Sequence, residues 1–411
     1  MFRKAVSGIL FALLLIGVLA FALNIRLVNA SGTIYIKADG SVEPPDAPIL
    51  NVENVSYTLI DNIYDSIVVE RDNIVIDGEG STVRGTEAYD SKGIYLSGRR
   101  NVTIKNMEIK AFYYGILLYG SSNNSIVGNN IANNKYGMGL SESSNNSIVR
   151  NNITANSWDG IWLSVSSKNS IVRNNITNNY WGVALYLSSN SKIYYNNFIN
   201  NKDPVYDGSW DYPEYYAPSI NVWDHSYPFG GNYWSNYTGV DLYSGVYQNV
   251  TGSDGIGDTA LTIDKNNRDC YPLMAPISVF DDGTWNGASY SVDVISNSTV
   301  SEFQLNTTEK TIKFNVTGET GLGFCRVTIP NIVIQNMWHG NYTVLINDQP
   351  WPFTNWTDTE NTHIYFTYQH SEHEITIIPE FPQATILSLF MILSLPVLVF
   401  TKRKLSRKHK T

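Results

Sequence analysis

The sequence predicts an all-β protein, a right-handed parallel β-helix of about 22 residues per coil followed by a small β-sandwich. The main observation is a repeat: Asn-Ser-Ile-Val-Gly-Asn-Asn-Ile begins at Asn124, close copies begin at Asn146 and Asn169, and a looser copy begins at Asn190. A fixed period of this length is typical of solenoids, whose units stack along one axis. In residues 289–378, short alternating strands separated by turn residues are typical of a sandwich.

The first 30 residues have the features of a secretion signal. Arg3 and Lys4 precede an apolar run, and Val28-Asn29-Ala30 offers a small-residue cleavage site. An uncleaved signal anchor is the alternative. Residues 31–70 follow as a β-rich lead-in, with a strand expected at 33–36.

Residues 71–202 carry the repeat, and its apolar positions explain why the coils must stack. One coil cannot bury its own apolar residues, whereas stacked coils bury them in a continuous column. Leucine-rich and hexapeptide patterns are absent, which favours a parallel β-helix. The residues that share positions are Ile116, Met138, Ile161 and Val183; Leu118, Leu140, Leu163 and Leu185; and Ile131, Ile153, Ile176 and Phe198.

A set of asparagines also shares one position in the coil: Asn130, Asn152, Asn175 and Asn197. Stacked amides bond from coil to coil, and Asn tolerates the left-handed backbone of a sharp corner. We therefore expect a structural ladder, which argues against glycans on Asn152 and Asn175 although both lie in N-x-[ST] sequons. Other sequons, such as those at Asn54 and Asn249, make a glycoprotein possible.

The repeat decays in residues 203–278, a stretch rich in Trp, Tyr, Pro, Gly and Asp that is expected to close the β-helix. Residues 280–288 are predicted to be a linker, and the sandwich strands are expected at 290–295, 311–316, 342–346 and 363–367. An apolar run at 383–400 is near the lower limit for spanning a bilayer. The basic tail at 401–411 would stay in the cytoplasm, leaving the rest of the chain outside the cell.

The charge distribution excludes one class of partner. Of 28 basic residues, three precede residue 31 and six follow residue 400, which leaves 19 against 37 acidic residues between them. Because this region has a net charge of −18, we expect no nucleic-acid partner. Its two cysteines, Cys270 and Cys325, either form a disulfide outside the cell or remain free thiols.

Aromatic residues gather beside the repeat glycines and predict a glycan-stacking surface. Trp158 and Tyr180 are 22 residues apart and should stack on adjacent coils, while Trp162 should point outward between Ile161 and Leu163. Sugar rings stack on exposed aromatic faces; mutual packing of these rings is the alternative. The candidate ligand-binding residues are Tyr136, Trp158, Asp159, Trp162, Tyr180 and Trp181.

An acidic, glycine-rich loop is a candidate calcium site. Asp254-Gly-Ile-Gly-Asp258 offers hard oxygen ligands on a flexible loop, and Asp241 is a further candidate ligand. Asp-Gly pairs also form ordinary turns, so a loop without metal is the alternative. No other cofactor is expected.

Three stretches resemble the archaeal NosD-type family of β-helix surface proteins. They are Asp72-Asn-Ile-Val-Ile-Asp-Gly-Glu-Gly80; Gly231-Asn-Tyr-Trp-Ser-Asn-Tyr237 with Asp254-Gly-Ile-Gly-Asp258 and Tyr271-Pro-Leu273; and Pro379-Glu-Phe-Pro382 before the apolar run. The last resembles a PEF-type sorting signal, which implies a sortase-like processing enzyme as a partner. The resemblance also implies copper handling, but the solenoid has no Cys, and the only His of the solenoid and its closing segment is His225.

These observations favour a membrane-anchored cell-surface protein that binds glycans or serves adhesion or envelope structure without catalysis. A polysaccharide hydrolase or lyase is the first alternative. Hydrolysis needs two facing carboxylates, and the acids of the repeat fall at different positions; a lyase base would have to come from Arg150 or Arg173. A copper or other metal accessory protein is the second alternative. No catalytic residue is assigned.

Overall fold

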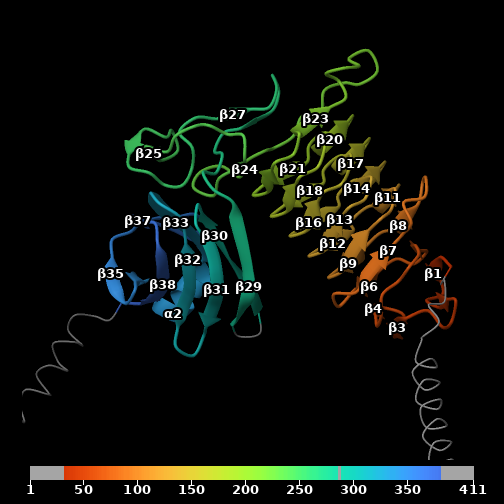
Figure 1. Ribbon diagram of the computed structural model, residues 1–411, viewed down its shortest axis with the longest axis horizontal. Helices are drawn as coiled ribbons and strands as arrows, with labels where there is room; N and C mark the ends of the chain where they lie inside the picture. The colour runs from red at the N-terminus through yellow and green to blue at the C-terminus, as the bar shows by residue number, and fades with distance from the viewer. Residues whose placement is uncertain (1–31, 286–287, 381–411) are drawn as a thin grey trace, which may run out of the picture.

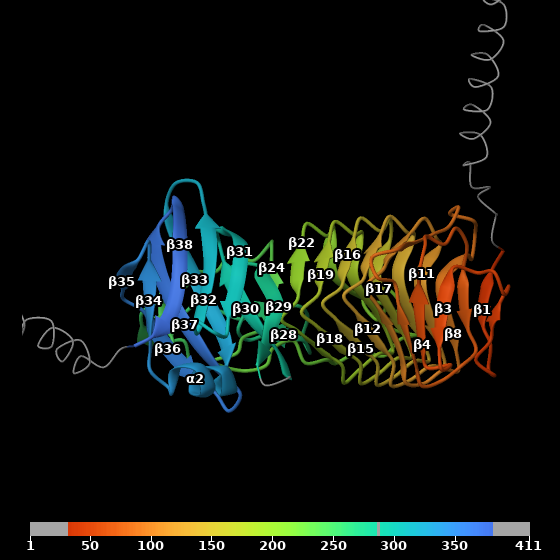
Figure 2. The ribbon, with the colours of Figure 1, turned by 90° about the horizontal axis from the view of Figure 1, so that it is seen from below.

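The structure is a computed structural model that describes residues 32–285 and 288–380. The predicted signal peptide, membrane anchor and basic tail lie outside these ranges. Within them, no helix has the length and apolar character needed to cross a membrane. Three long sheets wind into a β-helix, a closing segment follows, and two antiparallel sheets pack together beside it (Figure 1, Figure 2).

Each sheet of the β-helix receives one strand from successive coils. The first sheet contains β1 (Ile34–Ile36), β2 (Val42–Glu43), β5 (Ile67–Val69), β8 (Lys92–Ser97), β11 (Tyr114–Tyr119), β14 (Tyr136–Ser141), β17 (Asp159–Ser164), β20 (Trp181–Tyr186) and β23 (Asp203–Asp207). The second contains β3 (Ile49–Val52), β4 (Ser56–Leu59), β6 (Ile74–Asp77), β9 (Val102–Lys105), β12 (Ser125–Val127), β15 (Ser147–Val149), β18 (Ser170–Val172) and β21 (Lys192–Tyr194). The third contains β7 (Thr82–Arg84), β10 (Glu108–Lys110), β13 (Asn130–Ala132), β16 (Asn152–Thr154), β19 (Asn175–Thr177), β22 (Asn197–Ile199) and β24 (Tyr233–Trp234).

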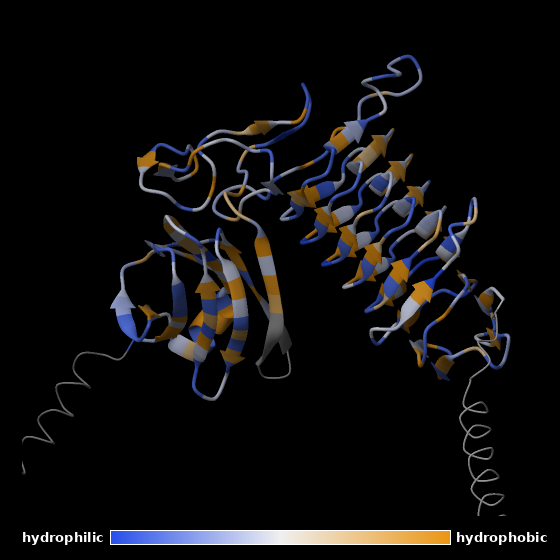
Figure 3. Ribbon diagram, in the orientation of Figure 1, coloured by the Kyte–Doolittle hydropathy of each residue, from blue (hydrophilic) through white to orange (hydrophobic). Residues whose placement is uncertain are grey.

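Pairing between coils confirms the predicted apolar columns. Ile116 pairs with Met138, which pairs with Ile161, and all three side chains are fully buried. Apolar and polar residues alternate along the strands, which turns one set of side chains toward the core (Figure 3). The solenoid begins earlier than the sequence repeat indicates, because β1 already pairs in parallel with β5.

The buried polar ladders lie one residue before the predicted set. Asn151 Nδ2 donates to the Ile126 carbonyl at 2.8 Å and to Asn174 Oδ1 at 3.0 Å. Asn152 does donate to Asn130 Oδ1 at 2.8 Å, but it is only half-buried on the outside of the coil. The buried ladders run through Asn124, Asn146 and Asn169; Asn129, Asn151, Asn174 and Asn196; Asn134, Asn156 and Asn179; and Ser121, Ser143, Ser166 and Ser188.

The left-handed backbone at these corners belongs to the residue before each ladder amide, which corrects the expectation that the asparagines adopt it. Gly128, Arg150 and Arg173 have φ values of 64°, 58° and 58°. The ladder residue that follows each of them turns its amide into the corner, where it bonds to carbonyl groups of the neighbouring coils. The corner therefore depends on the buried amide more than on the residue type at the left-handed position.

The repeat glycines are required because they face the backbone of the next coil. A Cβ on Gly137 would lie 2.6 Å from the Gly160 carbonyl oxygen and 2.8 Å from Asn156 Nδ2. Neither atom moves without shifting the coil spacing. We expect Gly137→Ala to lower the free energy of unfolding by about 1–3 kcal/mol, measured by chemical denaturation of the purified protein.

Gly139→Ala is the matched control for that substitution. Gly139 lies on the same strand but faces outward, where a Cβ would first meet the flexible end of Leu117 at 2.9 Å. Ala184 occupies the same register position two coils later, so the site tolerates a methyl group. Equal losses of stability for the two substitutions would contradict the role assigned to Gly137.

The closing segment, residues 208–276, covers the last coil with buried aromatic rings. Trp234 stacks on Phe198 with centroids 4.4 Å apart, and its Nε1 donates to Asp269 at 2.8 Å. Asp269 is fully buried, and this burial raises its pKa to about 7. Four short strands complete the segment: β25 (Tyr243–Ser244), β26 (Val250–Thr251), β27 (Leu261–Thr262) and β28 (Arg268–Asp269).

Two five-stranded antiparallel sheets enclose a second core. One contains β29 (Ile277–Trp285), β30 (Ala288–Ser296), β33 (Leu322–Pro330), β37 (Asn361–Gln369) and β36 (Thr354–Thr357). The other contains β31 (Thr299–Asn306), β32 (Thr311–Thr317), β38 (Glu372–Pro379), β34 (Tyr342–Ile346) and β35 (Gln349–Trp351). Helix α2 (Asn331–Trp338), which the sequence patterns did not predict, packs on this core through Trp338.

The predicted linker at 280–288 is wrong. Strand β29 runs through it and pairs with β30, with a bulge between Phe280 and Gly283. The acidic and glycine residues at this bulge have the composition of a turn, although the chain stays in the sheet.

Buried polar contacts join the β-helix to the sandwich. Arg173 forms an ion pair with the buried Asp293 at 2.7 Å, and Arg326 donates to the carbonyl groups of Asp254 and Pro228 in the closing segment. Apolar residues from all three parts form one further buried cluster at this junction. Both cysteines are free thiols, so the alternative of a disulfide across this junction is not realised.

Candidate functional site

The outer face of the first sheet brings several of the predicted ligand-binding residues into one register. The pairing of β11 with β14 places Tyr114 beside Tyr136, and the pairing of β17 with β20 places Asp159 beside Trp181. Strands β14 and β17 are also paired, so these four side chains follow one another across consecutive coils. Because coils rise by roughly 4.8 Å, side chains in one register come into contact.

Aromatic rings form a continuous series of contacts along this face. Trp158 and Tyr180 are stacked, with centroids 6.5 Å apart and planes 26° apart, as the sequence predicted. Trp181 stacks on Tyr206 at 4.0 Å, and Tyr206 contacts Trp210 in the closing segment. We define the aromatic row as Tyr89, Tyr113, Tyr114, Tyr136, Trp158, Trp162, Tyr180, Trp181, Tyr206 and Trp210.

Part of this row is open to solvent. Trp158 is 46% exposed, Tyr180 41% and Trp210 43%, whereas Tyr89 at one end is 86% exposed. Trp162 is half-buried and lies between Gly139 and Ala184 on the neighbouring strands, as expected for an outward residue. The rings therefore pack against each other, as the alternative interpretation expects, and still expose part of their surface to solvent; glycan stacking on them stays a prediction.

Two lysines place their ammonium groups over rings of the row. Lys135 Nζ lies 4.5 Å from the centre of the Tyr113 ring and 5.3 Å from that of Trp158. Lys202 Nζ lies 4.0 Å from the centre of the Tyr180 ring and donates to the Tyr180 hydroxyl at 2.7 Å. These cation–π contacts hold ring faces in place and add positive charge along one edge of the row.

Asp159 lies beneath the middle of the row and is only 1% exposed. Its Oδ1 has no hydrogen-bond partner, and burial raises the pKa of its carboxyl group to about 7. Burial also raises the pKa of Tyr114 to about 12, with the charge of Asp159 contributing. A buried carboxyl group without a partner costs stability, and such groups concentrate at functional sites.

Sequence reasoning missed the two ends of the row. Tyr89 lies in the coil before the clear repeat, and Tyr206 and Trp210 follow its last copy, so periodicity gave no register for them. Their contacts with Tyr113 and Trp181 place them on the same face. The richness of the 203–216 stretch in Tyr and Trp was the only available signal.

Aspartate side chains that accept from backbone amide groups hold the acidic loop. Asp241 accepts from the amide groups of Asp254 and Gly255, and Asp258 accepts from those of Leu242 and Tyr243. Burial raises the pKa of Asp241 to about 7. Within residues 32–285 and 288–380, no three His, Cys, Asp or Glu side chains are grouped as metal ligands would be. The calcium site thus stays a prediction from sequence.

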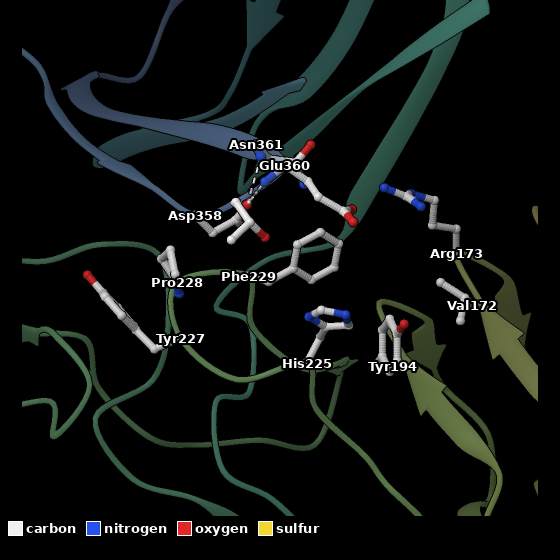
Figure 4. Close-up of a pocket in the computed structure, with 11 residues that line it drawn as sticks. Val172, Arg173, Tyr194, His225, Tyr227, Pro228, Phe229, Asp358, Glu360 and Asn361 are labelled. Atoms are coloured by element: carbon white, nitrogen blue, oxygen red, sulfur yellow. Dashed lines mark hydrogen bonds between the residues drawn. The ribbon is translucent and has the colours of Figure 1, made fainter. Parts of the chain in front are cut away.

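A pocket of about 340 Å³ lies where the β-helix, the closing segment and the sandwich meet (Figure 4). His225 lines it between the rings of Tyr194 and Phe229, with centroids 4.9 Å away in each case. Arg173 and Glu360 also line it, and Arg173 is engaged by Asp293. Its charged groups thus mainly serve the contact between the two parts of the molecule.

The donor set of the β-helix does not fit a resident copper ion. Copper sites use imidazole, thiolate or thioether ligands in groups. His225 lies among aromatic rings, and the imidazole of His363, on the sandwich side of the junction, is bonded to Thr328 and Asp358. The described residues hold no cluster of three potential ligands, so no step of the function is assigned to copper.

Known structures with weak similarity include β-helix enzymes and phage proteins. The periplasmic alginate epimerase AlgG is 24% identical, with 37% of this chain and 36% of that chain covered and a TM-score of 0.32. The Azotobacter vinelandii mannuronan C-5 epimerase AlgE4 A-module is 12% identical, with 37% and 57% covered and a TM-score of 0.30. Tailspike protein 2 of Escherichia coli O157:H7 bacteriophage CAB120 is 11% identical, with 80% and 51% covered and a TM-score of 0.29.

The chain thus spans between one third and three fifths of these structures, and likenesses at this level do not bear on activity. No curated protein matches the chain. The sequence profile of the family described as "Periplasmic copper-binding protein (NosD)" matches residues 31–239, which is half of the chain and includes the whole β-helix. The protein belongs to the NosD family.

Proposed function

We propose that this protein binds an extended glycan along the aromatic row, without chemical conversion. The observation that carries the proposal is the unbroken series of ring contacts across successive coils, with Trp158 and Tyr180 exposed at its centre. Aromatic faces stack on the apolar faces of sugar rings, and contiguous exposed apolar side chains mark interaction sites. The polar groups at the edge, including Lys135 and Lys202, suit sugar hydroxyl groups.

The length of the row favours a polymer over a single sugar. The row crosses every coil from β8 to β23, each advancing by roughly 4.8 Å. A chain of sugars lying along the solenoid axis would meet a new ring at each coil. Contacts of this kind add up, so affinity should rise with oligosaccharide length.

The protein is proposed to act outside the cytoplasm, at the cell surface. Supporting this, the family description refers to periplasmic proteins, and the sequence predicts a signal peptide and a membrane anchor at 383–400. The resemblance of Pro379-Glu-Phe-Pro382 to a sorting signal adds a sortase-like enzyme as a proposed partner and an archaeal origin. The net charge of −18 between residues 31 and 400 is consistent with a glycan partner rather than a nucleic acid.

Binding is favoured over hydrolysis because Asp159 is buried, whereas the other acid in its register, Asp203, lies two coils away and is exposed to solvent. A glycosidase places two carboxyl groups about 5–10 Å apart. Burial raises the pKa of Asp159 to about 7, so its carboxyl group lacks the solvated environment in which a nucleophilic carboxylate stays ionised. Arg173, one of the two candidate lyase bases, is engaged by Asp293.

The test is retention of the full-length protein in gels that contain defined polysaccharides. For the polysaccharide that retains the wild type, Trp158→Ala should weaken binding at least about tenfold, equivalent to about 1.4 kcal/mol, because a central stacking face is lost. Tyr119→Ala is the control: Tyr119 is 46% exposed on the same sheet but lies at the other end of β11. No retention across the panel, or equal effects of both variants, would refute the proposal.

A further inference from the structure

The centre of the aromatic row contains a buried carboxyl group, that of Asp159, without a basic partner in the part of the chain that the structure describes. Asp159 is surrounded by aromatic groups: Tyr136 and Trp181 adjoin it in register, and its charge acts on the hydroxyl groups of Tyr114, Tyr136 and Tyr186. Among the described residues, no Lys, Arg or His affects its pKa, and its Oδ1 accepts no hydrogen bond. Ionisation of this carboxyl group therefore calls for a positive charge that the chain itself does not supply.

The same face already shows which cation its rings accept. Lys135 and Lys202 hold primary ammonium groups over the rings of Tyr113, Trp158 and Tyr180 at 4.0–5.3 Å. Ammonium groups bind the negative faces of aromatic rings, and more strongly where water is excluded; a nearby carboxylate adds an opposite charge. Tyr136, Trp181 and Asp159 lie between the two lysines. Aromatic faces and an acidic group are therefore found together at this position.

We propose that Asp159 and the rings around it bind an ammonium group of the ligand, and that the glycan is a polymer of amino sugars with free amines. This inference rests on the proposed glycan-binding function and narrows its ligand. Stacking on Trp158 and Tyr180 would hold the sugar chain, and one amine would enter beneath the rings to pair with Asp159. Because Asp159 is buried, this pairing requires the half-buried rings of Tyr136 and Trp181 to move apart when the ligand binds.

Binding would be coupled to proton release. Near pH 6 the Asp159 carboxyl is largely protonated, because burial raises its pKa to about 7. Pairing with an ammonium group favours the carboxylate, so the bound complex would release close to one proton at about that pH. The other titratable groups that face Asp159, the hydroxyl groups of Tyr114, Tyr136 and Tyr186, stay protonated because their pKa values are raised.

The experiment compares two probes of equal length by calorimetry on the full-length protein, a glucosamine oligomer with free amines and its fully N-acetylated counterpart. We expect the free-amine oligomer to bind about tenfold more tightly. Titration near pH 6 in buffers of different ionisation enthalpy should show release of about one proton. Asp159→Asn should abolish both the preference and the proton release.

Three results would overturn the inference. They are equal affinity for the two oligomers, failure of the free-amine oligomer to bind, and a preference that survives in Asp159→Asn, which would reflect general attraction to an acidic protein. None of these results decides the proposed glycan-binding function. That function is tested separately, by whether a polysaccharide retains the wild type and retains Trp158→Ala less. Thermal denaturation of Asp159→Asn establishes that the variant is folded.

Discussion

Replacing Asp159 with Asn is expected to stabilise the protein at neutral and alkaline pH. Burial raises the pKa of this carboxyl group from 3.8 to about 7, so the folded state binds its proton more tightly than the unfolded state does. The fold therefore loses stability progressively as pH rises from about 4, and the loss is complete above about pH 7. A pKa difference of about three units between the folded and unfolded states corresponds to at most about 4 kcal/mol. This is the upper limit of the gain in unfolding free energy that we expect for Asp159→Asn at about pH 8.

The sign of this effect reverses the usual expectation for a buried polar residue, and pH provides the check. Below about pH 4 the carboxyl is protonated in both states, so the advantage of Asp159→Asn should vanish. Asp203→Asn is the control, because Asp203 occupies the same register next to Trp181 but is exposed. Chemical denaturation at several pH values measures both. A loss of stability in Asp159→Asn at about pH 8 would mean that the carboxylate makes bonds essential to the fold.

Replacing Asn151 with Ala is expected to cause the largest loss of stability. Asn151 Oδ1 accepts from the backbone and side-chain nitrogens of Asn129, and its Nδ2 donates to the Ile126 carbonyl. All of these groups are buried. An Ala leaves the Asn129 backbone amide and the Ile126 carbonyl without this partner, and Asn129 Nδ2 keeps only its bond to the Ile104 carbonyl. At about 1–3 kcal/mol for each such group, the loss should be about 4 kcal/mol.

Asn152→Ala tests whether the effect belongs to the buried ladder. Asn152 is the adjacent residue, carries the same amide and is half-buried on the outside of the coil. We expect it to lose about 1 kcal/mol or less. If the denaturation curves of Asn151→Ala and Asn152→Ala coincide, the corner amides are not what stabilises the coil.

The sequence predicted the columns of the β-helix well because they follow directly from its period. Ile126, Ile148 and Ile171 pair as their spacing required. The choice between Asn151 and Asn152 could not be made in this way, since both recur with the same period. Which of them turns inward depends on the left-handed residue before them, which here is Arg150, a residue type that gives no such signal.

Outside the repeat, residue composition led to a wrong prediction, because pairing of the backbone within a sheet outweighed the turn-forming tendency of the residues. The stretch 280–288 has turn-forming residues, yet a bulge at Phe280 and Gly283 keeps it in strand β29. At the candidate site, the positions of Trp158, Tyr180 and Trp162 on one face followed from spacing. The burial of Asp159 did not, because it depends on rings from several coils and on their tilt.

A crystal structure of the protein with the best-binding oligosaccharide tests the central claim most directly. The account predicts sugar rings lying flat on Trp158 and Tyr180, with the chain running along the solenoid axis across the first sheet. Sugar bound solely elsewhere, for example in the pocket lined by His225 and Glu360, would contradict it.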